Sequence, residues 1–387
     1  MRILLLHSSS DIYGASKIFL QTVALLRKRG HECTVVLSST GPLQVELENH
    51  GAKVHIINLG ILRRQYFNPS GIINRFIKWR NASKQLTTLI QSEQIELVYS
   101  NTAAVLIGAW VARKNKIPHY WHLHEIIEKP KQLHGFLVWC MKHGAAKIIT
   151  VSDAVSACWR DAGKIIRVYN GIEPIPQTAT NNLRAQYNIP EYAMVLGIAG
   201  RIHIIKGQSY FLDIANELLK LQSYTYTKCY FLIAGDPFPG QEYLVNQMLA
   251  KINKLQLNNR VHYIGMVQNM ANFYNAIDVL VVSSVLPDSL PTVILEAMQF
   301  SLPVVATAQG GAMEMIMTEP AISNSIGSVH TTGILIPINN AQVAAEKINN
   351  ILSKEKLQQM GAAGKQRVED YFSASAFEKN ILSVIES

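Results

Sequence analysis

The chain has 387 residues, of which 48% are hydrophobic and 16% are charged, and its formal net charge is +9. This composition leaves enough apolar side chains for a large core, and the length predicts two domains of ordinary size. Four cysteines lie far apart without a CxxC pair, which favours free buried thiols over a disulfide framework. No uncharged apolar run reaches 18 residues, so the sequence predicts no membrane-spanning helix. The apolar run near Met1 is too short for a secretion signal and predicts a first buried strand.

The positive charge is confined to the first half of the chain. Residues 1–178 contain 22 Lys or Arg against 11 Asp or Glu, whereas residues 179–387 contain 14 against 16. A basic half-molecule indicates an anionic surface nearby. That surface can be membrane lipid, a phosphorylated acceptor or nucleic acid.

Buried strands alternate with helices through this first half, which we predict to be one domain, residues 1–172. Alternation at this spacing predicts a parallel sheet with helices on both faces. The predicted strands are 2–9, 32–39, 53–59, 95–101, 118–125 and 147–152, and the best-defined helices are 14–30, 41–51 and 72–92.

A polar, proline-rich stretch interrupts the pattern, and we place a linker at 173–190. The alternation then restarts in a second domain, 191–370. Its predicted strands are 194–201, 229–235, 261–265, 278–284 and 303–307, and its predicted helices are 206–221, 241–255, 269–276 and 291–300, before closing helices at 341–353, 355–370 and 373–386. The predicted fold class is therefore α/β, with two doubly wound, Rossmann-like parallel-sheet domains facing across a cleft. Such sheets bind ligands at the carboxyl ends of their strands.

Two cations follow the first strand of the second domain. Arg201 lies at the end of that strand and Lys206 lies at the start of the next helix. Helix amino ends attract anions, and two cations add to that attraction. We interpret the pair as a diphosphate site, against the alternative of two exposed surface cations.

Two carboxylates bracket seven uncharged residues later in this domain, Asp288 and Glu296. They are either a surface acid and a helix-start charge, or parts of a site for a ligand rich in hydroxyls and phosphates. Gly14, after the first strand of the chain, can expose backbone N–H groups to the same cleft. No complete GxGxxG follows either domain-opening strand, which weighs against a nicotinamide dehydrogenase.

Three histidines lie on one predicted strand, His119, His122 and His124, and Glu125 follows them. Alternation places His122 and His124 on the same face. A zinc site lacks an obvious third ligand nearby in sequence. The alternatives are hydrogen-bonded histidines at a strand end and a polar contact with a substrate.

The stretch 62–84 combines cations with apolar and aromatic residues. Ile72, Ile73, Phe76 and Ile77 fall on one helical face, and a membrane or acceptor surface is predicted at Arg63, Arg64, Arg75, Lys78, Trp79 and Arg80. This pattern fits a helix whose apolar face enters anionic lipid. It fits a core-facing helix with a solvated basic side equally well.

Taken in order, these motifs resemble retaining GT-B glycosyltransferases of family 4, also called glycosyl transferases group 1, that use nucleotide sugars. The resemblance runs from "HSSSDIYGASKIFLQTVALLRKRGHECTVV" through "GRIHIIKGQ" and "PDSLPTVILEAMQFSLPVVATAQGGAMEMI" to "MGAAGKQRVEDYFS". It implies an N-terminal acceptor domain and a C-terminal donor domain. It also implies that the last helix, 371–387, packs back on the first domain.

The resemblance assigns roles to single residues. It implies that Glu296 accepts hydrogen bonds from the donor ribose, and that Asp288, where the family pattern has Glu, reaches the donor sugar. Arg201 and Lys206 correspond to the cations that neutralise the leaving diphosphate, so that no metal or other cofactor is expected. His124 corresponds to the histidine that faces the donor sugar, and Gly14 to the first-loop glycine near the diphosphate. The loop Ser289, Leu290 and Pro291 is expected to offer backbone groups to the sugar and phosphates.

The sequence thus predicts a retaining, metal-independent hexosyl- or N-acetylhexosaminyltransferase that favours UDP-sugars and builds bacterial surface polysaccharide. Its predicted partners are a nucleotide sugar, a glycan or lipid-linked acceptor and an anionic membrane surface. We expect it in the cytoplasm, on the inner face of the membrane. Three alternatives stay open: a GT-B nucleotide-sugar epimerase, a nucleic-acid-binding protein that uses the basic half, and a non-catalytic scaffold.

Overall fold

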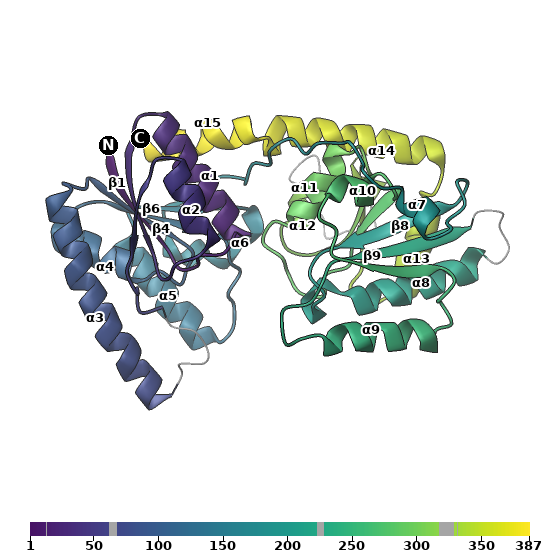
Figure 1. Cartoon of the computed structure of the whole chain (residues 1–387), viewed down its shortest axis with the longest axis horizontal. Helices are drawn as coiled ribbons and strands as arrows, with labels where there is room; N and C mark the ends of the chain where they lie inside the picture. Colours follow the sequence, from purple (N-terminus) through teal and green to yellow (C-terminus); the bar gives the residue numbers. More distant parts are fainter. Residues whose placement is uncertain (13, 62–67, 223–227, 317–328, 331) are drawn as a thin grey trace. The chain divides into compact units, whose positions relative to one another are not determined.

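The protein is described by a computed structural model covering residues 1–12, 14–61, 68–222, 228–316, 329–330 and 332–387. These residues form two compact units (Figure 1). Unit 1 consists of Met1–Gly171 with Phe377–Ser387, and unit 2 of Ile172–Ala376. Arg63 and Arg64, predicted to belong to a membrane or acceptor surface, lie outside the described residues.

The described part of unit 1 contains a seven-stranded parallel sheet in the order β3-β2-β1-β4-β5-β6-β7. The strand order reverses between β1 and β4, which pair with each other. Such a switch point is where an open α/β sheet binds its ligand, at the carboxyl ends of the strands. The strands are β1 (Arg2–His7), β2 (Glu32–Leu37), β3 (Lys53–Ile56), β4 (Leu97–Asn101), β5 (His119–Leu123), β6 (Lys147–Thr150) and β7 (Ile165–Arg167).

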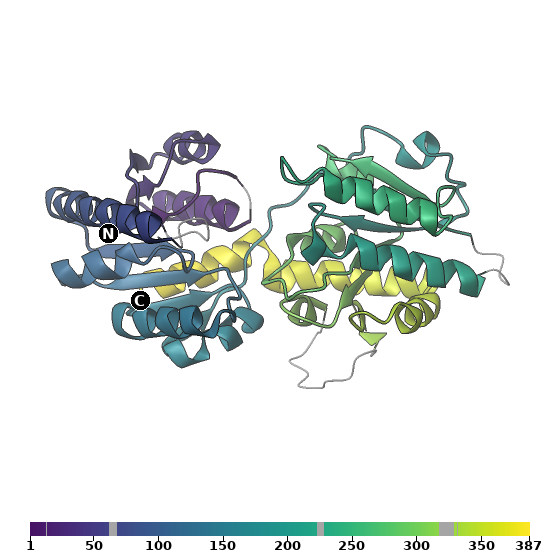
Figure 2. The ribbon, with the colours of Figure 1, turned by 90° about the horizontal axis from the view of Figure 1, so that it is seen from below.

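Helices cover both faces of this sheet, because alternate residues of the buried strands point to opposite sides. Ile3 and Leu5 of β1 pack in one core with helices α1 and α2, whereas Leu4 and Leu6 pack in another with α3 and α4. Figure 2 shows the helices on the two sides of the strands. The helices are α1 (Ala15–Lys28), α2 (Pro42–Asn49), α3 (Pro69–Ser92), α4 (Ile107–Asn115), α5 (Lys131–Gly144) and α6 (Asp153–Cys158), followed by a 3-10 turn at Arg160–Ala162.

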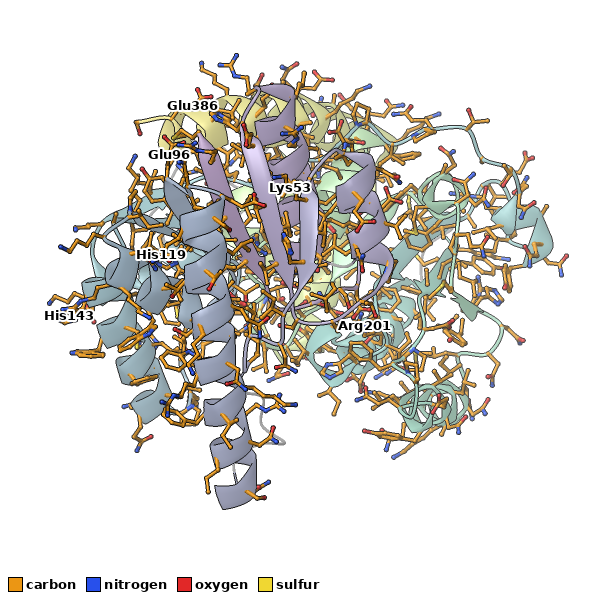
Figure 3. All side chains as sticks on the ribbon, turned by 60° about the vertical axis from the view of Figure 1, so that its left-hand side comes forward. Lys53, Glu96, His119, His143, Arg201 and Glu386 are labelled. Atoms are coloured by element: carbon orange, nitrogen blue, oxygen red, sulfur yellow. The ribbon has the colours of Figure 1, made fainter. Side chains whose placement is uncertain are left out.

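The last helix of the chain, α15 (Ala374–Ile385), contributes to the core of unit 1. Its apolar face joins the cluster on the α1 side of the sheet, through Phe377, Ile381, Leu382, Val384 and Ile385. Glu386, labelled in Figure 3, lies 3.0 Å from Nε2 of His31. Burial of this apolar face supplies the driving force for the return of the chain to unit 1.

The described part of unit 2 repeats the same plan in the order β10-β9-β8-β11-β12-β14-β13, with only β13 antiparallel. Here the order reverses between β8 and β11, which pair with each other. The strands are β8 (Met194–Ala199), β9 (Cys229–Ala234), β10 (Val261–Gly265), β11 (Val279–Val282), β12 (Val304–Thr307), β13 (Val329–His330) and β14 (Gly333–Ile336).

The main core of unit 2 lies between this sheet and helices α8, α9 and α13. The helices and turns are α7 (Leu183–Gln186), a 3-10 turn (Ile204–Lys206), α8 (Gln208–Gln222), α9 (Tyr243–Lys254), α10 (Met270–Tyr274), α11 (Thr292–Gln299), α12 (Ala312–Ile316), α13 (Ala341–Asn349), α14 (Lys354–Arg367) and a π-helical turn (Val368–Phe372). Among the described residues, no helix combines the length and apolar character needed to cross a membrane.

The stretch expected to be a linker, residues 173–190, packs on unit 2. The backbone N–H of Thr180 donates to Oδ1 of Asn272 at 2.7 Å, and Arg184 forms an ion pair with Asp278 at 2.8 Å. The stretch also contains the short helix α7. Its prolines therefore mark an irregular surface segment of unit 2 that is held by side-chain hydrogen bonds.

Candidate functional site

The turn after β8 places two cations at the switch point of unit 2. Arg201, labelled in Figure 3, follows β8 by two residues, and its guanidinium carbon lies 3.4 Å from the centre of the Phe238 ring. Lys206 ends the 3-10 turn, just before α8. Both predicted diphosphate residues therefore lie where the carboxyl end of a central strand meets the amino end of a 15-residue helix. That arrangement suits an anion.

A close backbone contact fixes the position of Lys206. Gly207 has φ +73°, and a Cβ atom there would lie 1.8 Å from the carbonyl oxygen of Ser283. The Ser283 hydroxyl donates to the Gly207 carbonyl at 2.8 Å, and the N–H of Val285 donates to the Ile205 carbonyl at 2.8 Å. The lysine turn is thereby attached to the residues that follow β11. Only glycine tolerates both the conformation and the contact at position 207.

Lys206 forms an ion pair with Asp288, the first of the two predicted carboxylates. Lysine Nζ and carboxylate Oδ2 lie 2.5 Å apart, and the side chains are 36% and 24% exposed. An ion pair that remains open to solvent contributes at most about 1 kcal/mol. A ligand phosphate can therefore replace Asp288 as the partner of Lys206 at a small cost in free energy. The Asp288 carboxylate is then available to another group.

The loop that carries Asp288 rests on the paired glycines Gly310 and Gly311. The N–H of Gly311 donates to the Asp288 carbonyl at 2.8 Å. A Cβ atom at 310 would lie 2.3 Å from the Asp288 carbonyl oxygen, and one at 311 would lie 2.0 Å from that of Ser289. The glycines that follow β12 thus allow the 288–290 backbone to pack against them.

The residues after Asp288 differ in what they can offer a ligand. Leu290 has a buried side chain and Ser289 is half-buried. The carbonyl of Pro291 accepts the N–H of Ile294 at 3.1 Å. Pro291 has no N–H to donate to a phosphate, and its carbonyl already accepts one hydrogen bond at the start of α11. A contact between its backbone and the donor sugar stays a prediction.

Glu296, the second predicted carboxylate, lies on α11 beside a buried tyrosine. The hydroxyl of Tyr274 donates to its Oε2 at 2.7 Å. Burial, together with the adjacent carboxylate, raises the pKa of Tyr274 well above its usual range, so the phenol keeps its proton and donates it. This bond orients the carboxylate, whose remaining lone pairs can accept hydroxyl groups.

In unit 1, a chain of hydrogen bonds crosses the carboxyl ends of three neighbouring strands. Nε2 of His7 lies 2.9 Å from Oγ of Ser16, and Nδ1 of His7 lies 3.0 Å from Nδ2 of Asn101. Oδ1 of Asn101 lies 2.9 Å from Nε2 of His124. These hydrogen bonds connect α1 with the ends of β1, β4 and β5. His124 therefore lies near the switch point of unit 1.

This series of hydrogen bonds determines which nitrogen of His124 carries the proton. Nδ2 of Asn101 also donates to the carbonyl of Ala15 at 3.3 Å, which fixes the orientation of the amide. Oδ1 then faces His124, whose Nε2 must be the donor. Burial and the nearby rings of His122 and His7 hold the pKa of His124 well below its usual range, so the ring is neutral. Nδ1 of His124 is consequently a hydrogen-bond acceptor.

The other histidines on this strand are buried and neutral. Burial lowers the pKa of His122 to about 3 and that of His119 to about 4. The Tyr99 hydroxyl lies 2.6 Å from Nδ1 of His122, and the rings of His122 and His124 lie 4.3 Å apart. The alternation of side chains along the strand thus correctly predicted that these two rings lie on one face of the sheet.

Glu125 and Gly14 complete the surroundings of this network. Oε2 of Glu125 accepts the N–H groups of Ala103 and His124, each at 3.1 Å, and burial raises the pKa of the carboxyl. Gly14 precedes α1 with φ +45°, and a Cβ atom there would meet no other group within 4 Å. Gly14, His124 and the predicted residues on α3 belong to unit 1, whereas the other predicted site residues that the structure describes belong to unit 2.

Three apolar residues near the start of α3 do not pack into the core. Ile73, Phe76 and Ile77 are more than half exposed, whereas Trp79 packs against the core and Ala82 is the first fully buried residue of the helix in it. Arg75, Lys78 and Trp79 are half-buried and Arg80 is exposed. The interpretation of this part of α3 as a core-facing helix is therefore wrong.

Within the described residues, no group of three or more His, Cys, Asp or Glu side chains is arranged to hold a metal ion. All four cysteines are free thiols. The sequence pattern did not identify Asn101 or Tyr274 as site residues. Asn101 is the last residue of a predicted strand, which would have placed it at the ligand-binding edge, whereas Tyr274 lies in an apolar helix that gives no such signal.

Comparison with known proteins gives the same fold and identifies the family. A crystal structure of Anabaena Alr3699/HepE in complex with UDP matches the whole chain with a TM-score of 0.80 and 22% identity, covering 100% of both chains. A glycosyltransferase from Rickettsia africae ESF-5 matches with a TM-score of 0.78 and 20% identity over 99% of this chain and 97% of that one. These likenesses establish the fold as that of GT-B glycosyltransferases.

Two family models match consecutive parts of the sequence. "Glycosyltransferase Family 4" matches residues 12–174, and "Glycosyl transferases group 1" matches residues 179–367. The chain belongs to the family 4, or group 1, glycosyltransferases. The family assignment predicted from the sequence motifs is thus confirmed.

Curated relatives match only part of the chain. A D-inositol 3-phosphate glycosyltransferase of Kineococcus radiotolerans is 26% identical over 54% of this chain and 49% of its own. The uncharacterized glycosyltransferase MJ1059 of Methanocaldococcus jannaschii is 32% identical over 42% of this chain and 38% of its own. A lipopolysaccharide 1,2-N-acetylglucosaminetransferase of Salmonella typhimurium is 25% identical over 59% of this chain and 63% of its own. The chain thus spans about half, or less, of the length of the first two relatives.

Proposed function

We propose that this protein is a retaining glycosyltransferase that moves a sugar from a UDP-sugar to a lipid-linked glycan acceptor. The observation that carries the proposal is the ion pair of Lys206 and Asp288 at the switch point of unit 2, with Arg201 on the same turn. The cations bind the diphosphate and Asp288, once released, accepts donor-sugar hydroxyls. Glu296 accepts the ribose hydroxyls with the oxygen that faces away from Tyr274.

The chemistry assigned to the cations is stabilisation of the leaving group. Departure of the sugar leaves a nucleoside diphosphate with additional negative charge, and preorganised cations stabilise that charge without reorganisation. Arg201 and Lys206 supply the two positive charges, so we propose that transfer needs no metal ion. For retention we propose front-face transfer, in which the leaving phosphate accepts the proton of the acceptor hydroxyl.

His124 is proposed to contact the donor sugar. Its neutral ring offers Nδ1 as an acceptor for a sugar hydroxyl, and the hydrogen bond from Nε2 to Asn101 holds the ring in place. A neutral acceptor does not repel the positive charge that develops on the sugar ring in the transition state. Asn101 is accordingly a positioning residue.

The relatives support UDP and a surface glycan as the substrate classes. The Alr3699/HepE structure contains UDP, and the Salmonella relative is named for transfer to lipopolysaccharide. We propose that the protein works at the inner face of the cytoplasmic membrane, since the basic half of the chain includes exposed apolar residues on α3. A nucleotide-sugar epimerase would share the donor site but has no use for such a surface.

A calorimetric titration with UDP, GDP, ADP and CMP tests the proposal. We expect UDP to bind most tightly, and the Lys206→Met variant to lose most of that affinity. Lys251→Met is the matched control, because Lys251 also forms an ion pair at 2.7 Å, with Asp213 on the neighbouring helix. Equal UDP affinity in the Lys206 variant and the wild type would refute the assignment. A panel of UDP-sugars then identifies the donor, and isomerised sugar without transfer would identify an epimerase.

A further inference from the structure

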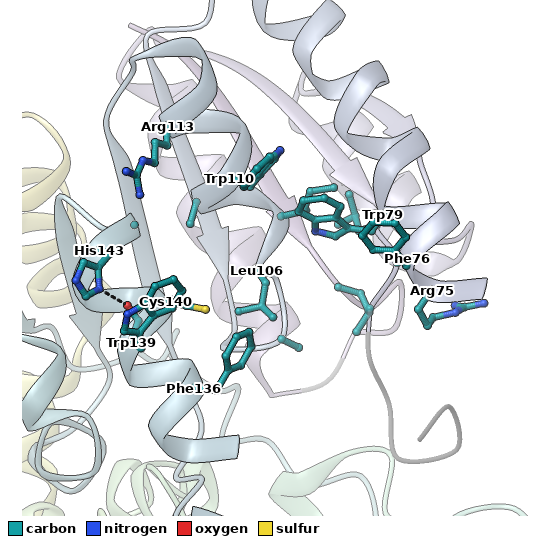
Figure 4. A pocket seen from close by; sticks show the side chains of 17 residues that line it. Arg75, Phe76, Trp79, Leu106, Trp110, Arg113, Phe136, Trp139, Cys140 and His143 are labelled. Carbon is teal, nitrogen blue, oxygen red and sulfur yellow. Dashed lines mark hydrogen bonds between the residues drawn. The ribbon is translucent and has the colours of Figure 1, made fainter. Parts of the chain in front are cut away.

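An aromatic groove opens on the face of unit 1 that α3, α4 and α5 form (Figure 4). Its volume is about 500 Å³, within the range of roughly 300–1,000 Å³ that is usual for small-molecule sites. Five rings from the three helices line it: Phe76, Trp79, Trp110, Phe136 and Trp139. None of these residues belongs to the donor or sugar contacts proposed above.

The rings are open to solvent although they lie together. Phe76, Trp110, Phe136 and Trp139 are 61%, 52%, 49% and 60% exposed. The ring centres of Trp79 and Trp110 are 5.3 Å apart, and those of Phe76 and Trp79 are 6.3 Å apart. Single exposed apolar residues are ordinary, but a contiguous exposed patch of this kind indicates a binding surface.

Close contacts of small residues set the shape of the groove. A Cβ atom on Gly60, in the segment after β3, would lie 2.8 Å from the backbone nitrogen of Trp79. A Cβ atom on Gly144, at the end of α5, would lie 2.7 Å from Cβ of Ala109 on α4. Both glycines line the groove. The walls are therefore held by tight packing and are not a gap between loosely packed helices.

The charge around the groove has one sign. Helices α3, α4 and α5, with 24, 9 and 14 residues, contain no Asp or Glu. They carry eight cations: Arg75, Lys78, Arg80, Lys84, Arg113, Lys114, Lys131 and Lys142. Arg75 and Arg113 are themselves among the residues that line the groove. An apolar groove surrounded by cations complements a ligand with a hydrocarbon part and an anionic part.

The groove lies close along the chain to the polar network of unit 1. Asn101 belongs to the network, and Ala104 and Leu106, a few residues further along, line the groove. Three residues of chain span at most about 11 Å. A molecule in the groove therefore has its polar end within reach of the carboxyl ends of the strands, where His124 lies.

We propose that the aromatic groove holds the hydrocarbon chain of the anionic lipid that carries the acceptor. This inference rests on the proposed function, to which it adds a site for the lipid itself. The rings enclose the chain, the arginines pair with the phosphate of the head group, and the attached glycan lies toward the Asn101 end. Such a site orients the acceptor, whereas adsorption on a membrane would only concentrate it.

A series of alkyl phosphates of increasing chain length, each below its critical micelle concentration, tests the site by calorimetry on the full chain. Affinity should rise about fourfold for each added methylene while the chain fills the groove, and then stop rising. The double variant Trp110→Ala with Trp139→Ala should lose at least tenfold in affinity. Tyr243→Ala, at an exposed ring on α9 of unit 2, is the matched control and should change nothing.

The anionic part is tested with alkyl glucosides of the same chain lengths. The wild type should bind the phosphates more tightly than the glucosides, and Arg113→Gln should reduce that preference. Far-UV circular dichroism checks that the variants are folded. Affinities unchanged in the double variant, or an affinity that rises with chain length without a plateau, would overturn the proposal.

Two further measurements distinguish a lipid site from a dimer interface and from a part of the donor site. Analytical ultracentrifugation that found a dimer, dissociated by the double tryptophan substitution, would assign the groove to a second copy of the chain and overturn the proposal. UDP titration of the same variants should give the wild-type affinity. If the wild type did not bind UDP, the proposed function would be contradicted. If the wild type bound UDP but no alkyl phosphate, only this inference would be contradicted.

Discussion

Nζ of Lys206 lies 2.5 Å from Oδ2 of Asp288, and this ion pair connects the turn after β8 with the loop after β11. The two strands are neighbours at the point where the strand order of unit 2 reverses. Without a ligand, the two charges neutralise each other. A bound diphosphate would compete with Asp288 for the lysine, so the two residues should respond differently to substitution.

Lys206→Met should lower UDP affinity about 10- to 100-fold, since a hydrogen bond to a charged group contributes roughly 1.5–3 kcal/mol. Asp288→Asn should leave UDP affinity unchanged or raise it, because it removes the competing carboxylate. The same variant should slow cleavage of the bond between UDP and the donor sugar, because Asp288 is proposed to contact that sugar. Calorimetry and single-turnover kinetics measure the two effects.

Asp213→Asn is the control for the aspartate, because Asp213 pairs with Lys251 at 2.7 Å in the same unit. It should alter neither UDP affinity nor turnover. An Asp288→Asn variant that lost as much UDP affinity as Lys206→Met would show that Asp288 only holds the lysine in position.

Glu296→Gln should reduce discrimination between UDP and its 2′- and 3′-deoxy analogues. The wild-type carboxylate is proposed to accept ribose hydroxyls, whereas the amide presents donors to them once its oxygen accepts the Tyr274 hydroxyl. We expect a preference for UDP of about tenfold in the wild type, equivalent to about 1.4 kcal/mol, and little preference in the variant. Competition titrations with the three nucleotides give these ratios.

Tyr274→Phe should have a smaller effect in the same direction, because it only frees the carboxylate to rotate. Tyr263→Phe serves as its control, since the Tyr263 hydroxyl also donates to a carboxylate, Asp236, at 2.7 Å. An unchanged preference for UDP in Glu296→Gln would exclude a ribose contact at this residue.

Asn101→Leu should disturb His124 without affecting UDP binding. The substitution removes the acceptor that holds the proton on Nε2, so nitrogen-15 NMR of the His124 ring should show a mixture of the two tautomers. Turnover should fall at least tenfold while UDP affinity stays unchanged. Asn101→Asp restores an acceptor for Nε2–H and should recover the single tautomer and part of the rate.

Asn115→Leu is the corresponding control, because Asn115 forms its 2.8 Å hydrogen bond within α4, to the carbonyl of Val111. It should leave the His124 spectrum unchanged. A single Nε2–H tautomer in Asn101→Leu would mean that another group fixes the ring and that Asn101 has no positioning role.

The buried histidines should make the protein less stable in mild acid. His119 has a folded-state pKa of about 4, below its ordinary value of 6.5, so the unfolded chain binds the proton first as pH falls. The contribution of the neutral ring to stability is complete above pH 6.5 and declines below it, by about 1.4 kcal/mol per pH unit until the folded pKa is reached. Urea unfolding should therefore show lower stability at pH 5.0 than at pH 7.5.

His119→Gln should reduce this difference by about 2 kcal/mol, because one group no longer titrates. The variant also loses hydrogen bonds to Ser100 and Gly144, so it should be less stable at both pH values, and only the difference is diagnostic. His50→Gln, on the surface, is the control. An equal difference in His119→Gln and in the wild type would show that His119 does not titrate on unfolding.

Much of the fold was predictable because buried parallel strands read as apolar runs. Residues Ile3–Leu6 are fully buried, and the basic last turn of α1 and Gly30 end the first helix where the sequence indicated. Two of the missed strands are β7 and β14, and β7 has only three residues, too few for an apolar run to be distinguished from a loop. Their positions depend on pairing with β6 and β12.

The candidate site was partly predictable for a related reason. Arg201 and Lys206 are only five residues apart in the sequence, at a strand end and a helix start, so their common location could be inferred. Tyr274 and Glu296 are 22 residues apart, and their contact depends on how α10 and α11 pack against the sheet. No spacing rule predicts such a contact. Likewise, the exposure of Phe76 and its neighbours depends on what covers α3, which its periodicity does not specify.

The proposed function depends above all on the binding of a nucleoside diphosphate by unit 2, through the turn after β8. Calorimetric titration of UDP into the wild type and into the variant Arg201→Met with Lys206→Met tests it most directly. We expect saturable binding to the wild type and a loss of at least a hundredfold in affinity in the double variant, with Lys251→Met unaffected. Equal UDP affinity in the wild type and the double variant would contradict it.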